Sequence, residues 1–142
     1  MLYRPAFLLG YAGLLPAFLC LLAAAFGPAA WHDLAYRTGG LYAGLILSFL
    51  GGSWWALATR APARQALRLH TIAVMPTLMA LALLMLPGPW QLVLLGSLIA
   101  ATLVVDRLLV RQRLAPDHWM KLRVPLSIGL AAATTGLGLL AL

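Results

Sequence analysis

The chain has 142 residues, of which 63% are hydrophobic and only 9% are charged, and its formal net charge at pH 7 is +7. A soluble domain has about 25% charged residues, so this composition leaves too few charged side chains to cover a water-soluble globule. We therefore expect an integral membrane protein, with residues 1–142 forming a single transmembrane domain.

Five apolar segments are each close to the roughly 20 residues that a helix needs to cross a bilayer. The Gly27-Pro28 pair, Pro62 and the Pro87-Gly88-Pro89 turn separate several of them. Because a helix satisfies its own backbone hydrogen bonds in lipid, we expect an all-α bundle of five transmembrane helices without strands. The expected helices cover residues 6–26, 39–59, 71–86, 90–110 and 124–142.

Two connections contain polar segments next to these spans. Residues 29–37 (AAWHDLAYR) precede the second span, and residues 63–70 (ARQALRLH) precede the third. We expect each to form a short amphipathic helix of its own on the membrane surface. Pro16 and Pro76 lie inside spans, where each removes a backbone hydrogen bond and should kink the helix.

The basic residues fall almost entirely on one side of the predicted bundle. All ten Lys and Arg residues except Arg37 lie at the N-terminus or close to the two connections on that side. Loops rich in Lys and Arg face the cytoplasm. We therefore expect a multi-pass protein of the bacterial inner (cytoplasmic) membrane, with a cytoplasmic N-terminus and a periplasmic C-terminus. The five tryptophans, which fall near span ends as in an aromatic belt, are Trp31, Trp54, Trp55, Trp90 and Trp119.

Small residues form one ridge of the second span. The ridge, read in steps of four, consists of Gly40, Gly44, Ser48, Gly52 and Ala56, with Gly51 beside it. Such small-xxx-small ridges let membrane helices approach closely. We expect this ridge to pack on the last span, at Ser127, Ala131 and Thr135, with the first span as the alternative partner. The other interpretation is a cavity beside the glycines with Trp54 and Trp55 as its walls.

Asp106 is the acidic residue placed inside a predicted span. A carboxylate at that depth is expected to be paired or to face an aqueous cavity. Arg68, His70 and Arg123 are available on the same side of the bundle. Two interpretations follow: a structural ion pair that locks the third, fourth and fifth spans together, or a binding site for a ligand or proton.

The residues around Asp106 and the tryptophan pair form our candidate ligand site. Its members are Trp54, Trp55, Arg68, His70, Asp106 and Arg123. The sequence has no nucleophile motif, metal-ligand spacing, phosphate-binding loop or pair of carboxylates. We therefore expect no enzyme activity, no bound metal and no cofactor. We expect the basic segments to lie on lipid headgroups and not to bind nucleic acid.

One segment of the second span matches a family signature. Residues 46–52 (ILSFLGG), with Tyr42 before them and Trp55 after them, resemble the signature of the transmembrane protein 69-like family. Further matching pieces are Gly13, Leu14, Pro16, Pro76, Asp106, Pro116, Trp119, Arg123 and Leu126. The resemblance implies a helical membrane fold without an assigned activity. Trp54 departs from the pattern, which often has a polar residue there, commonly histidine, and this departure favours packing over ligand binding.

Two functions are open from the sequence. The leading expectation is a small non-catalytic accessory or assembly factor that docks laterally on a larger membrane complex or associates with a second copy of itself. The small-residue ridge, which suits helix–helix contact, supports it. The alternative is a binder or carrier of a hydrophobic small molecule, such as a lipid, a quinone or a porphyrin-like compound, in a pocket between helices. The lipid bilayer is a partner in both cases.

Overall fold

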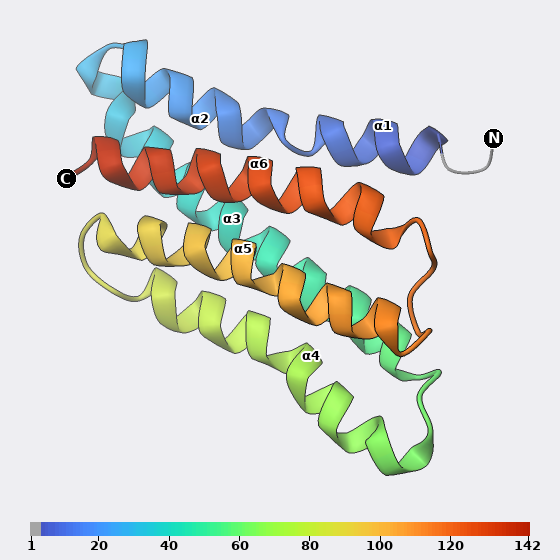
Figure 1. Cartoon of the computed structure of the whole chain (residues 1–142). Helices are drawn as coiled ribbons and strands as arrows, with labels where there is room; N and C mark the ends of the chain where they lie inside the picture. Colours follow the sequence, from blue (N-terminus) through green and yellow to red (C-terminus); the bar gives the residue numbers. More distant parts are fainter. Residues whose placement is uncertain (1–3) are drawn as a thin grey trace.

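The computed structural model describes residues 4–142, which form a bundle of helices packed side by side (Figure 1). The helices are α1 (Arg4–Ala12), α2 (Leu15–Phe26), α3 (Ala29–Ala58), α4 (Ala63–Leu84), α5 (Trp90–Arg111) and α6 (Trp119–Leu140). Helices α1 and α2 together make one span, so five spans in the described residues are long and apolar enough to cross a membrane. The predicted all-α architecture is confirmed at this level, and these spans indicate a multi-pass membrane protein.

The first span is broken between Ala12 and Leu15. Pro16 has no N–H to donate to the carbonyl of Ala12, which weakens the helix at this point. The side chain of Tyr42 in α3 donates a hydrogen bond to the carbonyl oxygen of Gly13 in the break. The kink predicted at Pro16 is therefore an interruption between two helices, and the hydrogen bond from Tyr42 of α3 stabilises it.

Helix α3 is longer than expected. It has 30 residues and is therefore about 45 Å long, well above the roughly 30 Å of a bilayer's hydrocarbon core. Residues 29–37 form its first turns, so the prediction of a separate surface helix there is wrong. Residues 63–70 likewise form the first turns of α4. No proline separates either segment from its span, and the two glycines at the first junction, Gly39 and Gly40, are buried by packing.

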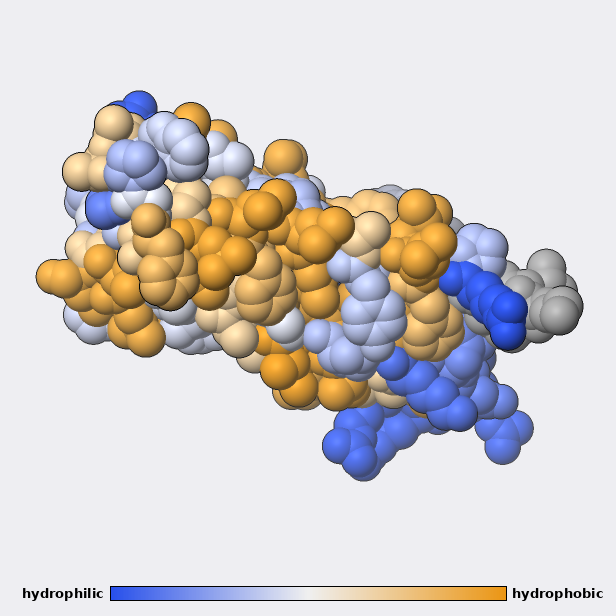
Figure 2. Space-filling model, turned by 90° about the horizontal axis from the view of Figure 1, so that it is seen from above, coloured by the Kyte–Doolittle hydropathy of each residue, from blue (hydrophilic) through white to orange (hydrophobic). Residues whose placement is uncertain are grey.

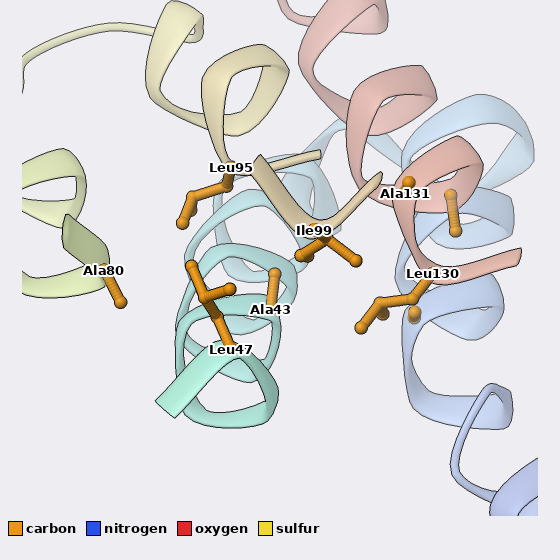
Figure 3. Close-up of a cluster of buried hydrophobic side chains, with 9 residues drawn as sticks. Ala43, Leu47, Ala80, Leu95, Ile99, Leu130 and Ala131 are labelled. Atoms are coloured by element: carbon orange, nitrogen blue, oxygen red, sulfur yellow. The ribbon is translucent and has the colours of Figure 1, made fainter. Parts of the chain in front are cut away.

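The bundle has its central core where α5 lies between α3 and α6 (Figure 3). The buried side chains there are Ala17, Ala43, Leu47, Ala80, Leu95, Ile99, Leu130, Ala131 and Ala133. Many of them are alanines, which let the helix backbones approach closely.

The glycine ridge of α3 packs on α4 and not on α6, so the predicted partner is wrong. A methyl group on Gly44 would meet Leu84 of α4 at 2.7 Å. Ser48 shares a hydrogen bond of 2.9 Å with Thr77 of α4. A methyl group on Gly51 would overlap the carbonyl oxygen of Ala73 in α4.

Two residues assigned to the ridge do not take part in this packing. A methyl group on Gly52 would have no atom within 4 Å, and Ala56 is exposed. The small residues of α6 face α5 instead, because a methyl group on Gly96 would overlap Thr135 and Ala131. Contact with α4, such as that between Gly44 and the long side chain of Leu84, therefore determines which glycines of α3 are buried.

Polar residues gather at one end of the bundle. Figure 2 shows hydrophobic side chains over its middle and the strongest concentration of hydrophilic ones at the end where α1 begins and where the α3–α4 and α5–α6 connections lie. Arg37 lies at the other end, paired with Asp33 at 3.0 Å on the exposed surface.

Candidate functional site

Asp106 is completely buried near the last turns of α5. Its Oδ1 accepts hydrogen bonds of 2.9 Å from the indole nitrogens of Trp54 in α3 and Trp119 in α6. Its Oδ2 accepts a bond of 2.9 Å from Nε of Arg123 in α6. Donors from two other helices therefore bind both carboxylate oxygens. We call this group, Trp54, Asp106, Trp119 and Arg123, the Asp106 cluster.

The turn after α5 brings α6 back to Asp106. Arg113 has a left-handed backbone with φ of 58°, and the next two N–H groups, of Leu114 and Ala115, both donate to the carbonyl of Leu109. This reversal is of the kind that commonly ends helices. Helix α6 then presents Trp119 and Arg123 on one face, because residues four apart on a helix are neighbours.

The Asp106 cluster contains a buried ion pair. The side chain of Arg123 is 8% exposed and that of Asp106 is 0% exposed, so each charge is shielded from solvent and relies on the other. The ion pair joins α5 and α6, and the hydrogen bond from Trp54 adds α3. The interpretation from the sequence had it join the third, fourth and fifth spans, so α3 takes the place expected for α4.

The remaining candidate residues lie elsewhere. Trp55 is exposed and stacks edge-on against His70 of α4, with ring centroids 4.5 Å apart. Nδ1 of His70 is 2.7 Å from the carbonyl oxygen of Ala66, and Arg68 is exposed. The assignment of Trp54 to an interfacial belt is wrong, since Trp54 is buried and bonded to Asp106. The tryptophan pair is thus divided between the interior and the surface.

A cavity of about 430 Å³ lies next to the Asp106 cluster, between α1, α3 and α6. We call it the α1–α3–α6 cavity. Its lining comprises Ala6, Leu9, Gly10, Gly13, Leu14, Ile46, Phe49, Leu50, Ser53, Ile99, Trp119, Leu122, Arg123, Leu126, Ser127 and Leu130. Leu9 and Phe49 line it and are each 71% exposed, so they mark a mouth on the side of the bundle. Trp54 and Asp106 are not among its lining residues.

Two polar groups in the wall of this cavity are buried and have no hydrogen-bond partner among residues 4–142. They are Nη2 of Arg123 and Oγ of Ser127. A buried polar atom left unpaired costs about 1–3 kcal/mol, and more if it is charged. Two other lining residues have partners: Ser53 donates to the carbonyl of Leu50 at 2.7 Å, and the indole of Trp119 donates to Asp106.

Sequence reasoning missed the cavity and two of its key residues. Trp119 was assigned to an aromatic belt, and Ser127 to a helix-packing face. A signal was present in the sequence, because Trp119, Arg123 and Ser127 recur every fourth residue in α6. Such a polar stripe marks one face of α6. Where the structure describes the chain, no three His, Cys, Asp or Glu residues group as metal ligands would.

A family model described as "protein of unknown function (DUF3429)" matches residues 2–139. The chain belongs to this family. The match to DUF3429 includes every residue of the Asp106 cluster and of the α1–α3–α6 cavity. No curated protein and no solved structure matches the chain.

Proposed function

We propose that this protein binds a hydrophobic small molecule in the α1–α3–α6 cavity, without catalysing a reaction. The observation that carries the proposal is the cavity itself. Its volume of about 430 Å³ falls within the range of about 300–1,000 Å³ typical of small-molecule sites. Most of its walls are aliphatic, with a small number of polar groups, which is also typical of such sites.

The position of the mouth supports entry from the bilayer. Leu9 of α1 and Phe49 of α3 are exposed on the side of the bundle and also line the cavity. In a membrane this surface faces lipid tails, so a hydrophobic molecule reaches the cavity without crossing water. The break at Gly13 lies in the same wall.

The test is to obstruct the mouth. Leu9→Trp adds a large ring where the side chain is 71% exposed, and Leu8→Trp makes the same change on the adjacent residue, which is 72% exposed and does not line the cavity. We expect native mass spectrometry in mild detergent to detect a hydrophobic molecule bound to the wild type. Its occupancy should fall severalfold in Leu9→Trp and stay unchanged in Leu8→Trp.

Two results would contradict the proposal. One is a wild-type protein that carries no small molecule and takes up none when it is incubated with extracted lipids. The other is an equal loss in both variants, which would place the bound molecule on the outer surface of α1 and not in the cavity.

The second candidate is an accessory factor that docks laterally on another membrane protein, on the surface around Gly52 and Ala56. Gly52 leaves open space on the outside of α3, and Ala56 is exposed one turn later. A photoreactive amino acid at Ala56 should crosslink to one defined membrane protein or to a second copy. The same group at Val104, which is exposed on α5, is the control.

The membrane and the orientation are also proposed. The end of the bundle that carries the basic residues would face the cytoplasm of a bacterial inner membrane, in accord with the positive-inside rule. Kinship with the transmembrane protein 69-like proteins belongs to the proposal as well, and the segment from Tyr42 to Trp55 supports it.

A further inference from the structure

We infer that the ligand of the α1–α3–α6 cavity carries a neutral carbonyl oxygen, which accepts hydrogen bonds from Nη2 of Arg123 and Oγ of Ser127. The inference rests on the proposed function and names the chemical class of its ligand. Esters of lipids and quinones share this group.

The first step is that two donors in the wall are available. Arg123 is 7% exposed and Ser127 is 2% exposed, and the two named atoms are buried without a partner in the part of the chain that the structure describes. A serine hydroxyl in a helix usually donates to a carbonyl of the preceding turn, as Thr71 and Ser97 do. Among residues 4–142, Ser127 has no such acceptor, so its proton is without a partner in the described protein.

The second step is geometric. Arg123 and Ser127 are four residues apart on α6, so they lie on the same face, one turn from each other. Both line the cavity. A carbonyl oxygen has two lone pairs and can therefore accept from both donors at once.

The third step is the charge of the site. Arg123 already has its counter-charge in Asp106, through the ion pair of 2.9 Å. A ligand with a carboxylate or phosphate would add an uncompensated negative charge next to buried Asp106, which is costly in an apolar site. A neutral acceptor binds the free N–H groups and leaves the charge balanced.

The test compares binding of four probes to purified protein in mild detergent: methyl palmitate, palmitate, hexadecane and a decyl-substituted benzoquinone. The ester or the quinone should bind at least about tenfold more tightly than palmitate and hexadecane. The tighter of the two names the source of the carbonyl.

Ser127→Ala removes one donor and keeps the helix. It should weaken ester or quinone binding about fivefold, the effect of one hydrogen bond, and leave hexadecane binding unchanged. Ser53→Ala is the matched control, because its hydroxyl lines the same cavity but already donates to Leu50. It should leave the preference of the wild type intact.

The outcomes separate the two proposals. Equal binding of all four probes, tightest binding of palmitate, or equal effects of the two serine variants would overturn the carbonyl inference while the cavity stayed a binding site. Binding of none of the probes by the wild type would overturn this inference. A wild-type protein that is empty in native mass spectrometry and takes up no extracted lipid would overturn the proposed function independently.

Discussion

Asp106 shows at the residue scale how one buried carboxylate joins three helices near the basic end of the bundle. Three N–H donors from Trp54, Trp119 and Arg123 surround it. The indole N–H of Trp54 is therefore a donor to a buried carboxylate, and its ring is buried in the bundle.

Replacing Asp106 should strongly destabilise the protein. Asp106→Asn leaves Arg123 buried without a counter-charge, which should cost about 3–5 kcal/mol of unfolding free energy. Asp33→Asn breaks a pair whose two side chains are each 75% exposed and should cost no more than about 0.5 kcal/mol. Thermal unfolding in detergent measures both. A similar, small shift for the two variants would contradict a stabilising role for the buried pair.

The two adjacent tryptophans should respond differently to the same substitution. Trp54→Phe removes the N–H that Asp106 accepts and should cost about 1.5–3 kcal/mol, as for hydrogen bonds to charged groups. Trp55→Phe keeps a ring that can stack on His70, at an exposed position, and should have a much smaller effect. Unfolding midpoints in detergent test the difference, and a larger loss in Trp55→Phe would refute our assignment.

At the scale of elements, α3 makes different contacts along each of its faces. One face packs closely on α4 through Gly44 and Gly51. Another carries Tyr42, which bonds to the break between α1 and α2. A third lines the α1–α3–α6 cavity with Ile46, Phe49 and other residues. Helix α3 thus connects the close packing against α4 to the α1–α3–α6 cavity.

The adjacent glycines of α3 provide a matched pair for this packing. Gly51→Ala would place a methyl group against the carbonyl oxygen of Ala73 and should cost about 1–3 kcal/mol, as overpacking does. Gly52→Ala enters open space and should be neutral or slightly stabilising, because alanine favours a helix over glycine. Unfolding midpoints in detergent measure the difference between the two variants. Equal midpoints would mean that α3 and α4 are not in close contact at Gly51.

At the scale of the whole molecule, charge and hydropathy divide the bundle into an apolar middle and a basic end (Figure 2). The described chain runs from Arg4 at the basic end to the last turn of α6 at the opposite end (Figure 1). With an odd number of spans, the two ends of the chain lie on opposite sides of the membrane in either orientation. The basic end should face the cytoplasm, because Lys and Arg are retained there during insertion.

Reporter fusions measure this orientation. Alkaline phosphatase fused after Leu142, or after Gly88 in the α4–α5 turn, should be active because both points lie at the less basic end. The same fusion after Ala61 or Asp117 should be inactive, and a fluorescent protein at those two points should be bright. The reversed pattern of activities would overturn the proposed orientation.

The apolar composition, the number of spans and the side on which basic residues gather followed from the sequence alone. These properties are local, since a stretch of about 20 apolar residues is helical in lipid whatever its neighbours. The ends of the helices were less accurate, because residues 29–37 and 63–70 continue the helices that follow them. Whether each helix continues through these residues depends on the absence of a proline there and, in α3, on the burial of Gly39 and Gly40 by other spans.

Only the tertiary structure decided which surfaces meet. The sequence showed a ridge of small residues on α3 but not that Leu84 and Ala73 of α4 would cover it. It placed Trp54 and Trp55 together, whereas the rotation of α3 against α5 buried the first beside Asp106 and left the second exposed. The cavity has the same origin, since it lies where α1, α3 and α6 do not close. Partner choice is a long-range packing property, which a local pattern of residues does not contain.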